Sequence, residues 1–254
     1  MRHADRWIES KYVQRSGRLV ASRNTAEVGV ASRLITDRTA ALYDQHLPHY
    51  ARGRLIDLGC GKVPLFGRYR GLVDEVTCVD WPHSVHVGHH LDLEADLSQP
   101  LPYVDASFDT IILSDVLEHV PTPEALWLEM ARVLAPNGHV LLNTPFLYGI
   151  HEAPHDYGRY TEFALRRFAR QAGLEVALLL PIGGSLQVLA DLLAKHLAHL
   201  PVVGNALASA VQGAVALLDR SRFGQRVTAR TGSRFPLGYF LVATRTGATR
   251  PPTA

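Results

Sequence analysis

The sequence predicts an α/β fold built around a doubly wound, mostly parallel sheet. Short β-branched segments such as Phe108 to Leu113 are typical of strands that are buried in a parallel sheet. Helical patterns alternate with these strands, which is typical of crossover connections between parallel strands. A glycine-containing turn, Gly59-Cys60-Gly61, follows the first of these strands, at the edge where open α/β sheets bind ligands.

The expected strands are short apolar runs that end at polar or glycine residues. We expect strands at 54–58, 75–80, about 87–93, 108–113, 139–143, 174–180 and 235–244. A helix is expected from about Ser32 to Tyr50, because its apolar residues recur at helical spacing. Residues 1–30 are polar and Arg-rich, so they are expected to form an arm or lid and no core element.

Two further helices have recognisable ends. Thr122 is a candidate cap for a helix that begins at Pro123, since proline suits the first helical position. The run Pro136-Asn137-Gly138 ends that helix. A second helix is expected from Thr161 to about Ala172, with a glycine after it as the stop.

These elements suggest three parts. Residues 1–50 form an N-terminal arm and helix, residues 51–182 together with 233–246 form the core, and residues 183–232 form a helical insertion. The insertion is expected to be a cap or a dimer surface, and the alternative is a surface that meets a lipid-linked acceptor. Polar and glycine residues interrupt it too often for a membrane-spanning helix.

Composition excludes several classes of protein. The 254 residues are 47% hydrophobic and 20% charged, which is typical of a globular chain and not of a disordered one. The net charge is +2, with no cluster of basic and aromatic residues, so nucleic-acid binding is not expected. Two cysteines without a CxxC spacing and the absence of a signal-peptide pattern favour a reducing, cytoplasmic setting.

The glycine turn and a downstream acid predict a nucleoside site. Glycine allows close approach of backbone to a ligand, and Asp80 ends the second strand, where a carboxylate can accept hydrogen bonds from both ribose hydroxyls. A dinucleotide site shares these features but needs a third glycine, and Pro64 stands there, without an N–H for a phosphate. A nicotinamide dehydrogenase is therefore disfavoured.

Six ordered motifs then resemble the class I (Rossmann-like) S-adenosylmethionine-dependent methyltransferases, and are similar to the branch found beside glycan-assembly genes. The motifs are Asp57-Leu58-Gly59-Cys60-Gly61, Cys78-Val79-Asp80-Trp81, Glu94-Ala95-Asp96-Leu97, the runs 101–109 and 114–120, and the run 132–138. The resemblance covers about residues 50–180, with a final strand near 235–245. It implies a seven-stranded sheet with an antiparallel last strand.

The resemblance also implies a role for each matching residue, with S-adenosylmethionine as the cofactor. Gly59, Cys60 and Gly61 would line its methionine part, and Asp57 would hold the loop. Asp80 would bind the ribose and Trp81 would cover the adenine. Asp96, the Leu97 backbone and the carbonyl of Ser114 would bind the adenine and the ammonium group. Val63 stands where the family often has glycine, and Glu118 and His119 are interpreted as braces of the following loop, with a catalytic role for His119 as the alternative.

His151-Glu152-Ala153-Pro154-His155 matches the H-E-x-x-H pattern of zinc peptidases. That pattern binds zinc only on a helix, where residues four apart share a face. Proline in a helix interior costs about 3 kcal/mol and also disfavours helical backbone at the residue before it. We therefore reject the zinc-peptidase interpretation, and no metal ion is expected.

The segment from Phe146 to Tyr160 is instead predicted to form the acceptor wall. His151, His155 and Asp156 are the candidate catalytic residues, because a hydroxyl acceptor needs a base and imidazole has a pKa near ~6.5. The candidate substrate-binding residues are Tyr148, Tyr157, Arg159 and Tyr160. In the alternative interpretation, Asp156 and Arg159 pair with each other and only fix the turn into the next helix.

These observations predict a methyltransferase, most simply one that methylates an oxygen of a sugar, glycan or related polar small molecule. The alternatives are N- or C-methylation of another small molecule, or a non-catalytic S-adenosylmethionine-binding partner of a glycosyltransferase. The expected partner is a small-molecule or glycan acceptor, with weak contact to a membrane surface and a homodimer as further alternatives.

Overall fold

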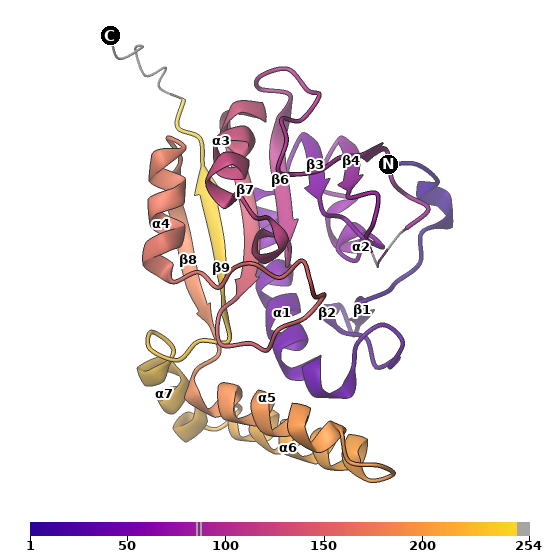
Figure 1. Ribbon diagram of the computed structural model, residues 1–254, viewed down its shortest axis with the longest axis vertical. Coiled ribbons are helices and arrows are strands. Elements are labelled where there is room, and N and C mark those ends of the chain that lie inside the picture. Colours follow the sequence, from indigo (N-terminus) through magenta and orange to yellow (C-terminus); the bar gives the residue numbers. More distant parts are fainter. Residues whose placement is uncertain (85, 87, 248–254) are drawn as a thin grey trace.

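The computed structural model describes residues 1–84, 86 and 88–247, and its centre is a seven-stranded sheet (Figure 1). The strands are β3 (Arg54–Leu58), β4 (Glu75–Asp80), β5 (Leu93–Glu94), β6 (Phe108–Ser114), β7 (Leu134–Pro145), β8 (Glu175–Ile182) and β9 (Gly238–Thr244), in the spatial order β5-β4-β3-β6-β7-β9-β8. Only β9 runs antiparallel to its neighbours β7 and β8 in this described sheet. The predicted fold class is confirmed.

Strand boundaries agree with the sequence pattern where the strands are buried. β3 and β4 match the expected ranges, whereas β7 begins at Leu134, directly after a helix, and continues to Pro145. The expected third strand, about 87–93, corresponds to β5, which in the described part of the chain covers only Leu93–Glu94. Val87 itself lies outside the described residues.

Alternation along the central strands divides the core into two layers. Ile111 and Leu113 of β6 face one layer, and Ile112 faces the other, as the two-residue period of a strand requires. The first layer is covered by α3 (Pro123–Val133) and α4 (Glu162–Gln171). The second is covered by α1 (Arg33–Tyr50) and the short α2 (Phe66–Tyr69).

The starts of the two predicted helices are capped differently in the structure. The Thr161 side chain accepts a hydrogen bond from the Ala164 N–H at 3.3 Å, which satisfies one of the free donors at the start of α4. Thr122 precedes α3 but its side chain makes no capping hydrogen bond, so that prediction is wrong. Pro123 supplies the first helical position there, and the Thr122 carbonyl accepts the first backbone bond.

The expectation that residues 1–30 hold no core element is wrong. They form a hairpin of β1 (Tyr12–Arg15) and β2 (Arg18–Ala21), after a 3₁₀ turn at Ala4–Arg6 and before another at Val30–Ser32. Tyr12 is 1% exposed and belongs to the α1 side of the core. Four-residue strands are too short for their alternation to be recognised among the surrounding arginines.

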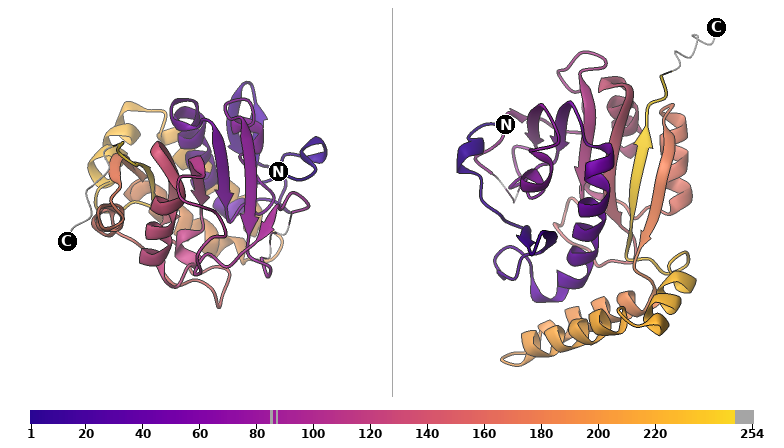
Figure 2. Two further views of the ribbon diagram at one scale, coloured as in Figure 1. Left: turned by 90° about the horizontal axis from the view of Figure 1, so that it is seen from above. Right: turned by 180° about the vertical axis from the view of Figure 1, so that it is seen from behind.

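Residues 183–232 contain three helices beyond one end of the sheet, α5 (Ser185–Ala198), α6 (Gly204–Leu218) and α7 (Arg222–Thr231) (Figure 2). The Gln212 side chain of α6 accepts a hydrogen bond from the Leu34 N–H at 3.0 Å and donates one to the Ala31 carbonyl. The insertion therefore contacts the start of α1. None of the helices that the structure describes is long and apolar enough to cross a membrane.

Candidate functional site

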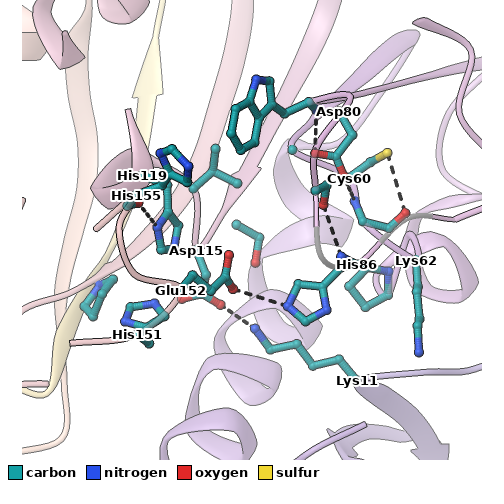
Figure 3. Close-up of a pocket in the computed structure, with 18 of the residues that line it drawn as sticks. Lys11, Cys60, Lys62, Asp80, His86, Asp115, His119, His151, Glu152 and His155 are labelled. Atoms are coloured by element: carbon teal, nitrogen blue, oxygen red, sulfur yellow. Dashed lines mark hydrogen bonds and ion pairs between the residues drawn. The ribbon is translucent and has the colours of Figure 1, made fainter. Parts of the chain in front are cut away.

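A cavity of about 610 Å³ opens at the carboxyl ends of β3, β4 and β6. The chain reverses direction across the sheet here, because β4 and β6 flank β3 on opposite sides, and ligands bind at such a point in open α/β sheets. Figure 3 shows Cys60 and Asp80 on one wall and His119, His151, Glu152 and His155 on the facing wall. The predicted residues that line the cavity are Gly59, Cys60, Gly61, Asp80, Trp81, Asp96, Leu97, Ser114, Tyr148, His151, His155 and Tyr157.

The glycine turn after β3 has left-handed backbone at both glycines, with φ of 69° at Gly59 and 52° at Gly61. A Cβ at position 59 would lie 2.4 Å from the Val116 side chain. Glycine at this position is therefore required by the packing of the turn against the segment after β6, which is a reason that the sequence did not suggest. A Cβ at position 61 would have only ordinary contacts, with His86 at 3.4 Å.

Asp80 links the end of β4 to the glycine turn. Its two carboxylate oxygens accept hydrogen bonds of 2.7 Å from the N–H groups of Gly61 and Trp81. Asp80 is 8% exposed, and burial raises its carboxyl pKa while the two N–H groups oppose the shift. Because a carboxylate has about four lone-pair sites, two acceptor positions remain for a ligand.

Asp57 lies within β3 and outside the cavity lining, unlike the other eight candidate cofactor residues. It is 4% exposed and accepts a 2.9 Å hydrogen bond from the Tyr69 hydroxyl. Burial raises the pKa of Asp57 to about 7, against the lowering effect of that hydrogen bond. Its direct partner is thus α2, and not the backbone of the glycine turn.

The remaining part of the first wall carries an aromatic ring and a turn. The Trp81 indole stands edge to face against the His155 imidazole, with ring centroids 4.8 Å apart. Asp96 accepts a hydrogen bond of 2.8 Å from the Ser98 N–H, and Leu97 is 8% exposed beside it. An indole face and a turn with both backbone and carboxylate groups suit an adenine ring.

The floor of the cavity contains a charged network that sequence reasoning missed. The Lys11 ammonium lies 2.6 Å from the Asp115 carboxylate, which also accepts from the Asn143 amide at 2.5 Å. Asn143 in turn accepts from the hydroxyls of Ser114 and Tyr43, each at 2.9 Å. Lys11 precedes the hairpin of the N-terminal segment, so only the tertiary fold brings it here. The left-handed backbone of Asp115, with φ of 54°, gives no sequence signal.

The H-E-x-x-H segment is irregular, which confirms the rejection of the zinc-peptidase interpretation. Residues 152–155 form a turn and bends outside any helix, and Glu152 has left-handed backbone with φ of 53°. The two histidines face different groups. His151 lies near Glu118, whereas His155 packs on Trp81 and its Nδ1 lies 3.0 Å from the Tyr157 hydroxyl.

Tyr148 is held at the cavity from both sides. Its hydroxyl lies 3.0 Å from the Ser32 hydroxyl, and the Lys195 ammonium of α5 sits 3.5 Å from its ring centroid. The helical insertion therefore contacts the predicted acceptor wall directly. Neither the N-terminal segment nor Lys195 was predicted to contact the site.

Besides Asp57, three predicted site residues of the acceptor loop do not line the cavity, namely Asp156, Arg159 and Tyr160. The Arg159 guanidinium binds both oxygens of the Asp156 carboxylate, at 2.5 and 2.7 Å, and holds the Asp156 pKa at about 2. Tyr160 packs against Phe168 of the core, with ring centroids 5.5 Å apart. The geometry favours the alternative interpretation, in which the Asp156–Arg159 pair fixes the turn.

Glu118 and His119 form a 3₁₀ turn at Leu117–His119 behind this wall. Glu118 is fully buried, and its backbone carbonyl accepts from the N–H groups of Tyr157 and Gly158 at 2.8 and 3.2 Å. Burial raises the pKa of the Glu118 carboxyl, partly opposed by the nearby His151 imidazole. The pair therefore holds the loop at residues 155–158, whereas the expected role was to brace the loop directly after it, and it also places an acid beside two imidazoles.

Comparison with known proteins identifies the domain. Residues 56–142 match the family model for a methyltransferase domain, over the segment that carries β3, β4, β6 and most of β7. This chain is a class I S-adenosylmethionine-dependent methyltransferase. The match spans the glycine turn, Asp80 and Ser114, so it covers the wall that carries these residues, whereas Tyr148, His151 and His155 of the facing wall lie after the matched segment.

Two curated relatives of this methyltransferase bear the same name. The ubiquinone biosynthesis O-methyltransferase of Burkholderia pseudomallei is 27% identical over 155 residues, which cover 50% of this chain and 67% of the relative. The ubiquinone biosynthesis O-methyltransferase of Xanthomonas euvesicatoria is 33% identical over 107 residues, which cover 37% of this chain and 44% of the relative. The likeness to glycan-associated enzymes is not reproduced by these relatives.

Solved structures share the fold at low identity. The [4+2]-cyclase SpnF has a TM-score of 0.55 and 21% identity, covering 95% of this chain and 88% of its own. An S-adenosylmethionine-dependent methyltransferase from Archaeoglobus fulgidus has a TM-score of 0.51 and 15% identity, covering 80% and 91%. These likenesses concern the fold.

The residues of the cavity fit S-adenosylmethionine. Its volume lies in the range of roughly 300–1,000 Å³ that is usual for small-molecule sites. Asp80 retains free acceptor positions for two hydroxyls, and Trp81 offers an aromatic face. Asp115, which is paired with Lys11 at 2.6 Å on the floor, places a carboxylate next to Ser114 in the lining.

Proposed function

We propose that this methyltransferase acts on a hydroxyl oxygen of a small-molecule acceptor. The observation that carries the proposal is the facing arrangement of two different walls in one cavity. One wall has the glycine turn and Asp80, and the other has His119, His151 and His155 within the same enclosure (Figure 3). An acceptor hydroxyl must lose its proton during transfer, and imidazoles suit that requirement.

The wall that carries the glycine turn, Asp80 and Trp81, here called the nucleoside wall, positions the donor. In this proposal the free acceptor sites of the Asp80 carboxylate bind both ribose hydroxyls, and the Trp81 indole covers the adenine. The Asp96–Ser98 turn meets the adenine edge, and the Ser114 carbonyl faces the amino-acid part. Bound S-adenosylmethionine supplies an electrophilic methyl group on sulfur; transfer to oxygen breaks the carbon–sulfur bond, leaves its electrons on sulfur and releases the hydroxyl proton.

The protein mainly has to orient the acceptor, because methyl transfer is an in-line displacement. Tyr148 and Tyr157 supply hydroxyls at the cavity, and Lys195 and Ser32 fix the Tyr148 ring. His151 lies at the acceptor end beside Tyr148, with ring centroids 5.4 Å apart. His155 lies nearer the adenine wall through Trp81, so His151 is the better placed of the two imidazoles.

Support for oxygen as the acceptor atom comes from the relatives, both of which are named O-methyltransferases. Their name points to ubiquinone-biosynthesis intermediates, whereas the motif resemblance points to a sugar or glycan. Both classes of acceptor present hydroxyl groups, which is the shared chemistry that we propose. N- or C-methylation is the competing outcome.

The test is an acceptor screen with isotopically labelled S-adenosylmethionine. Ubiquinone-biosynthesis intermediates, nucleotide sugars and glycans form the panel, and mass spectrometry identifies the methylated atom. The proposal predicts an O-methyl product, and a product methylated only on nitrogen or carbon would refute it.

Single variants then test the acceptor wall. His151→Ala and His155→Ala should lower turnover while they retain S-adenosylhomocysteine affinity. His196→Ala, an exposed histidine of α5, is the matched control. Full activity in both cavity variants would exclude a role for these imidazoles.

A further inference from the structure

Three side chains that commonly bind metal ions meet at the acceptor end of the cavity. Glu118 and His119 come from the 3₁₀ turn after β6, and His151 comes from the loop after β7. One ligand atom of each lies within 4.8 Å of the other two. The Nε2 atoms of His119 and His151 are both 3.8 Å from Oε1 of Glu118, too long for hydrogen bonds.

The Glu118 carboxylate has one oxygen without a partner. Oε2 accepts a hydrogen bond of 3.2 Å from the Thr144 hydroxyl. Oε1 is buried and has no hydrogen-bond partner among the residues that the structure describes. Because an unpaired buried carboxylate oxygen is costly, a cation at this point would satisfy it.

Both histidines are oriented with a free nitrogen toward that oxygen. Nδ1 of His119 lies 2.6 Å from the His155 carbonyl, which can only accept, so Nδ1 carries the proton. Nδ1 of His151 lies 3.3 Å from the Gly149 carbonyl and 3.4 Å from the Asp156 carboxylate, which are also acceptors and lie nearer than the donating Arg159 guanidinium at 3.5 Å. In each neutral ring the Nε2 lone pair therefore points to the cluster, as in metal-binding histidines held by an outer carbonyl or carboxylate.

We propose that Oε1 of Glu118 and the Nε2 atoms of His119 and His151 bind a divalent transition-metal ion. Two imidazoles and one carboxylate suit Zn²⁺, Co²⁺, Mn²⁺ or Fe²⁺ better than Mg²⁺ or Ca²⁺, which prefer oxygen ligands. Ligands at about 2.1 Å in tetrahedral geometry stand about 3.4 Å apart. The two 3.8 Å separations from Oε1 therefore need contraction by a few tenths of an ångström, and the separation between the two imidazole nitrogens, which is within 4.8 Å, by up to about 1.4 Å.

Three protein ligands leave a coordination position open, which is typical of catalytic metal sites. His119 and His151 line the cavity, so the open position faces the space assigned to the acceptor. This step rests on the proposed function: the acceptor hydroxyl oxygen occupies the open position, and the metal lowers its pKa. With the metal bound, His151 is a ligand and no longer the base proposed above, so the hydroxyl proton leaves to His155 or solvent. The sequence alone predicted no metal ion.

Metal binding is tested without any substrate or donor. The full-length protein, stripped with a chelator, is titrated with Co²⁺, and its visible absorption should saturate at a single equivalent, with Zn²⁺ displacing the signal. Glu118→Gln, His119→Ala and His151→Ala should each weaken Co²⁺ affinity more than about 100-fold, the upper range for loss of an outer-shell partner. Circular dichroism and thermal melting check that each variant is folded.

His86→Ala is the matched control for metal binding, because His86 lines the same cavity and pairs with Glu152 at 3.2 Å, outside the cluster. It should retain the Co²⁺ spectrum. Absence of Co²⁺ and Zn²⁺ binding by the wild-type protein, or equal binding by the three folded ligand variants, would overturn the site.

A second measurement separates the metal site from its proposed role. Methyl transfer by the stripped wild-type protein should fall and return on addition of Zn²⁺ or Mn²⁺. Full transfer by metal-free protein would overturn metal activation of the acceptor but leave O-methyl transfer intact. Metal binding without any methyl transfer to hydroxyl acceptors would instead refute the proposed function and leave the site in place.

Discussion

Replacing Asp80 with asparagine tests the ribose contact that we propose for the donor. The change preserves side-chain volume but removes the negative charge and one of the two acceptor oxygens. In the structure each oxygen already accepts one backbone N–H at 2.7 Å, so the native carboxylate keeps two further acceptor positions. The asparagine variant should retain roughly one bond to the ribose, without charge assistance.

The expected magnitude follows from the lost interaction. A hydrogen bond to a charged group contributes about 1.5–3 kcal/mol, and each 1.4 kcal/mol corresponds to about tenfold in affinity. We therefore expect S-adenosylhomocysteine to bind about 10- to 150-fold more weakly, as measured by isothermal titration calorimetry. Asp92→Asn is the matched control, because Asp92 also accepts a backbone N–H, from Cys78 at 2.8 Å, but lies outside the cavity lining.

A ligand-side comparison separates the ribose contact from loosening of the glycine turn. Methylthioadenosine and its 2′,3′-dideoxy analogue differ only in the two hydroxyls. The wild-type protein should discriminate strongly between them, and Asp80→Asn should discriminate much less. Equal discrimination by both proteins, or unchanged affinity for S-adenosylhomocysteine, would refute the assignment of the ribose to this carboxylate.

Three further predictions concern stability. Gly59→Ala should lower the free energy of unfolding measured by chemical denaturation, because the new Cβ would lie 2.4 Å from the Val116 side chain. Adding Val116→Ala should recover part of this loss, and no recovery would contradict the packing explanation. The pKa of Asp57 is raised to about 7 in the folded protein, so protonation of Asp57 stabilises the fold fully below about pH 4, and this stabilisation is lost as the pH rises toward 7. The free energy of unfolding should therefore decline over this pH range relative to that of Asp57→Asn. Parallel pH profiles of the two proteins would contradict the prediction. Thr161→Ala should cost about 1 kcal/mol through loss of the bond from the Ala164 N–H, whereas an unchanged melting curve would exclude that cap.

Local patterns carried enough information for the sheet and the nucleoside wall. The strands at 54–58 and 75–80 were predictable because buried parallel strands are continuous apolar runs with abrupt polar ends. The carboxyl ends of parallel strands meet at one edge of the sheet, so the sequence alone places Gly61, Asp80 and Ser114 together there.

The facing wall was harder to predict because its contacts depend on loops and on distant segments. The H-E-x-x-H pattern drew attention to His151 and His155 as a pair, yet His151 meets Glu118 and His155 meets Trp81. Arg159 was assigned to substrate, although its guanidinium binds a carboxylate three residues away. A charged side chain such as that of Arg159 can bind either a substrate or a nearby carboxylate, and sequence spacing does not show which of the two it binds.

The N-terminal segment illustrates a different limit. Lys11 and Tyr12 lie at the start of a short hairpin whose sequence shows no periodic pattern. Lys11 pairs with Asp115 and Tyr12 packs on the α1 side of the core, both far along the chain. Only the folded structure brings these residues to the cavity floor.

A crystal structure of the protein with S-adenosylhomocysteine tests the whole account most directly. We predict that the nucleoside lies across the ends of β3 and β4, with both ribose hydroxyls within hydrogen-bond distance of the carboxylate at position 80. A nucleoside bound at any other place on the molecule would contradict the assignment of both walls.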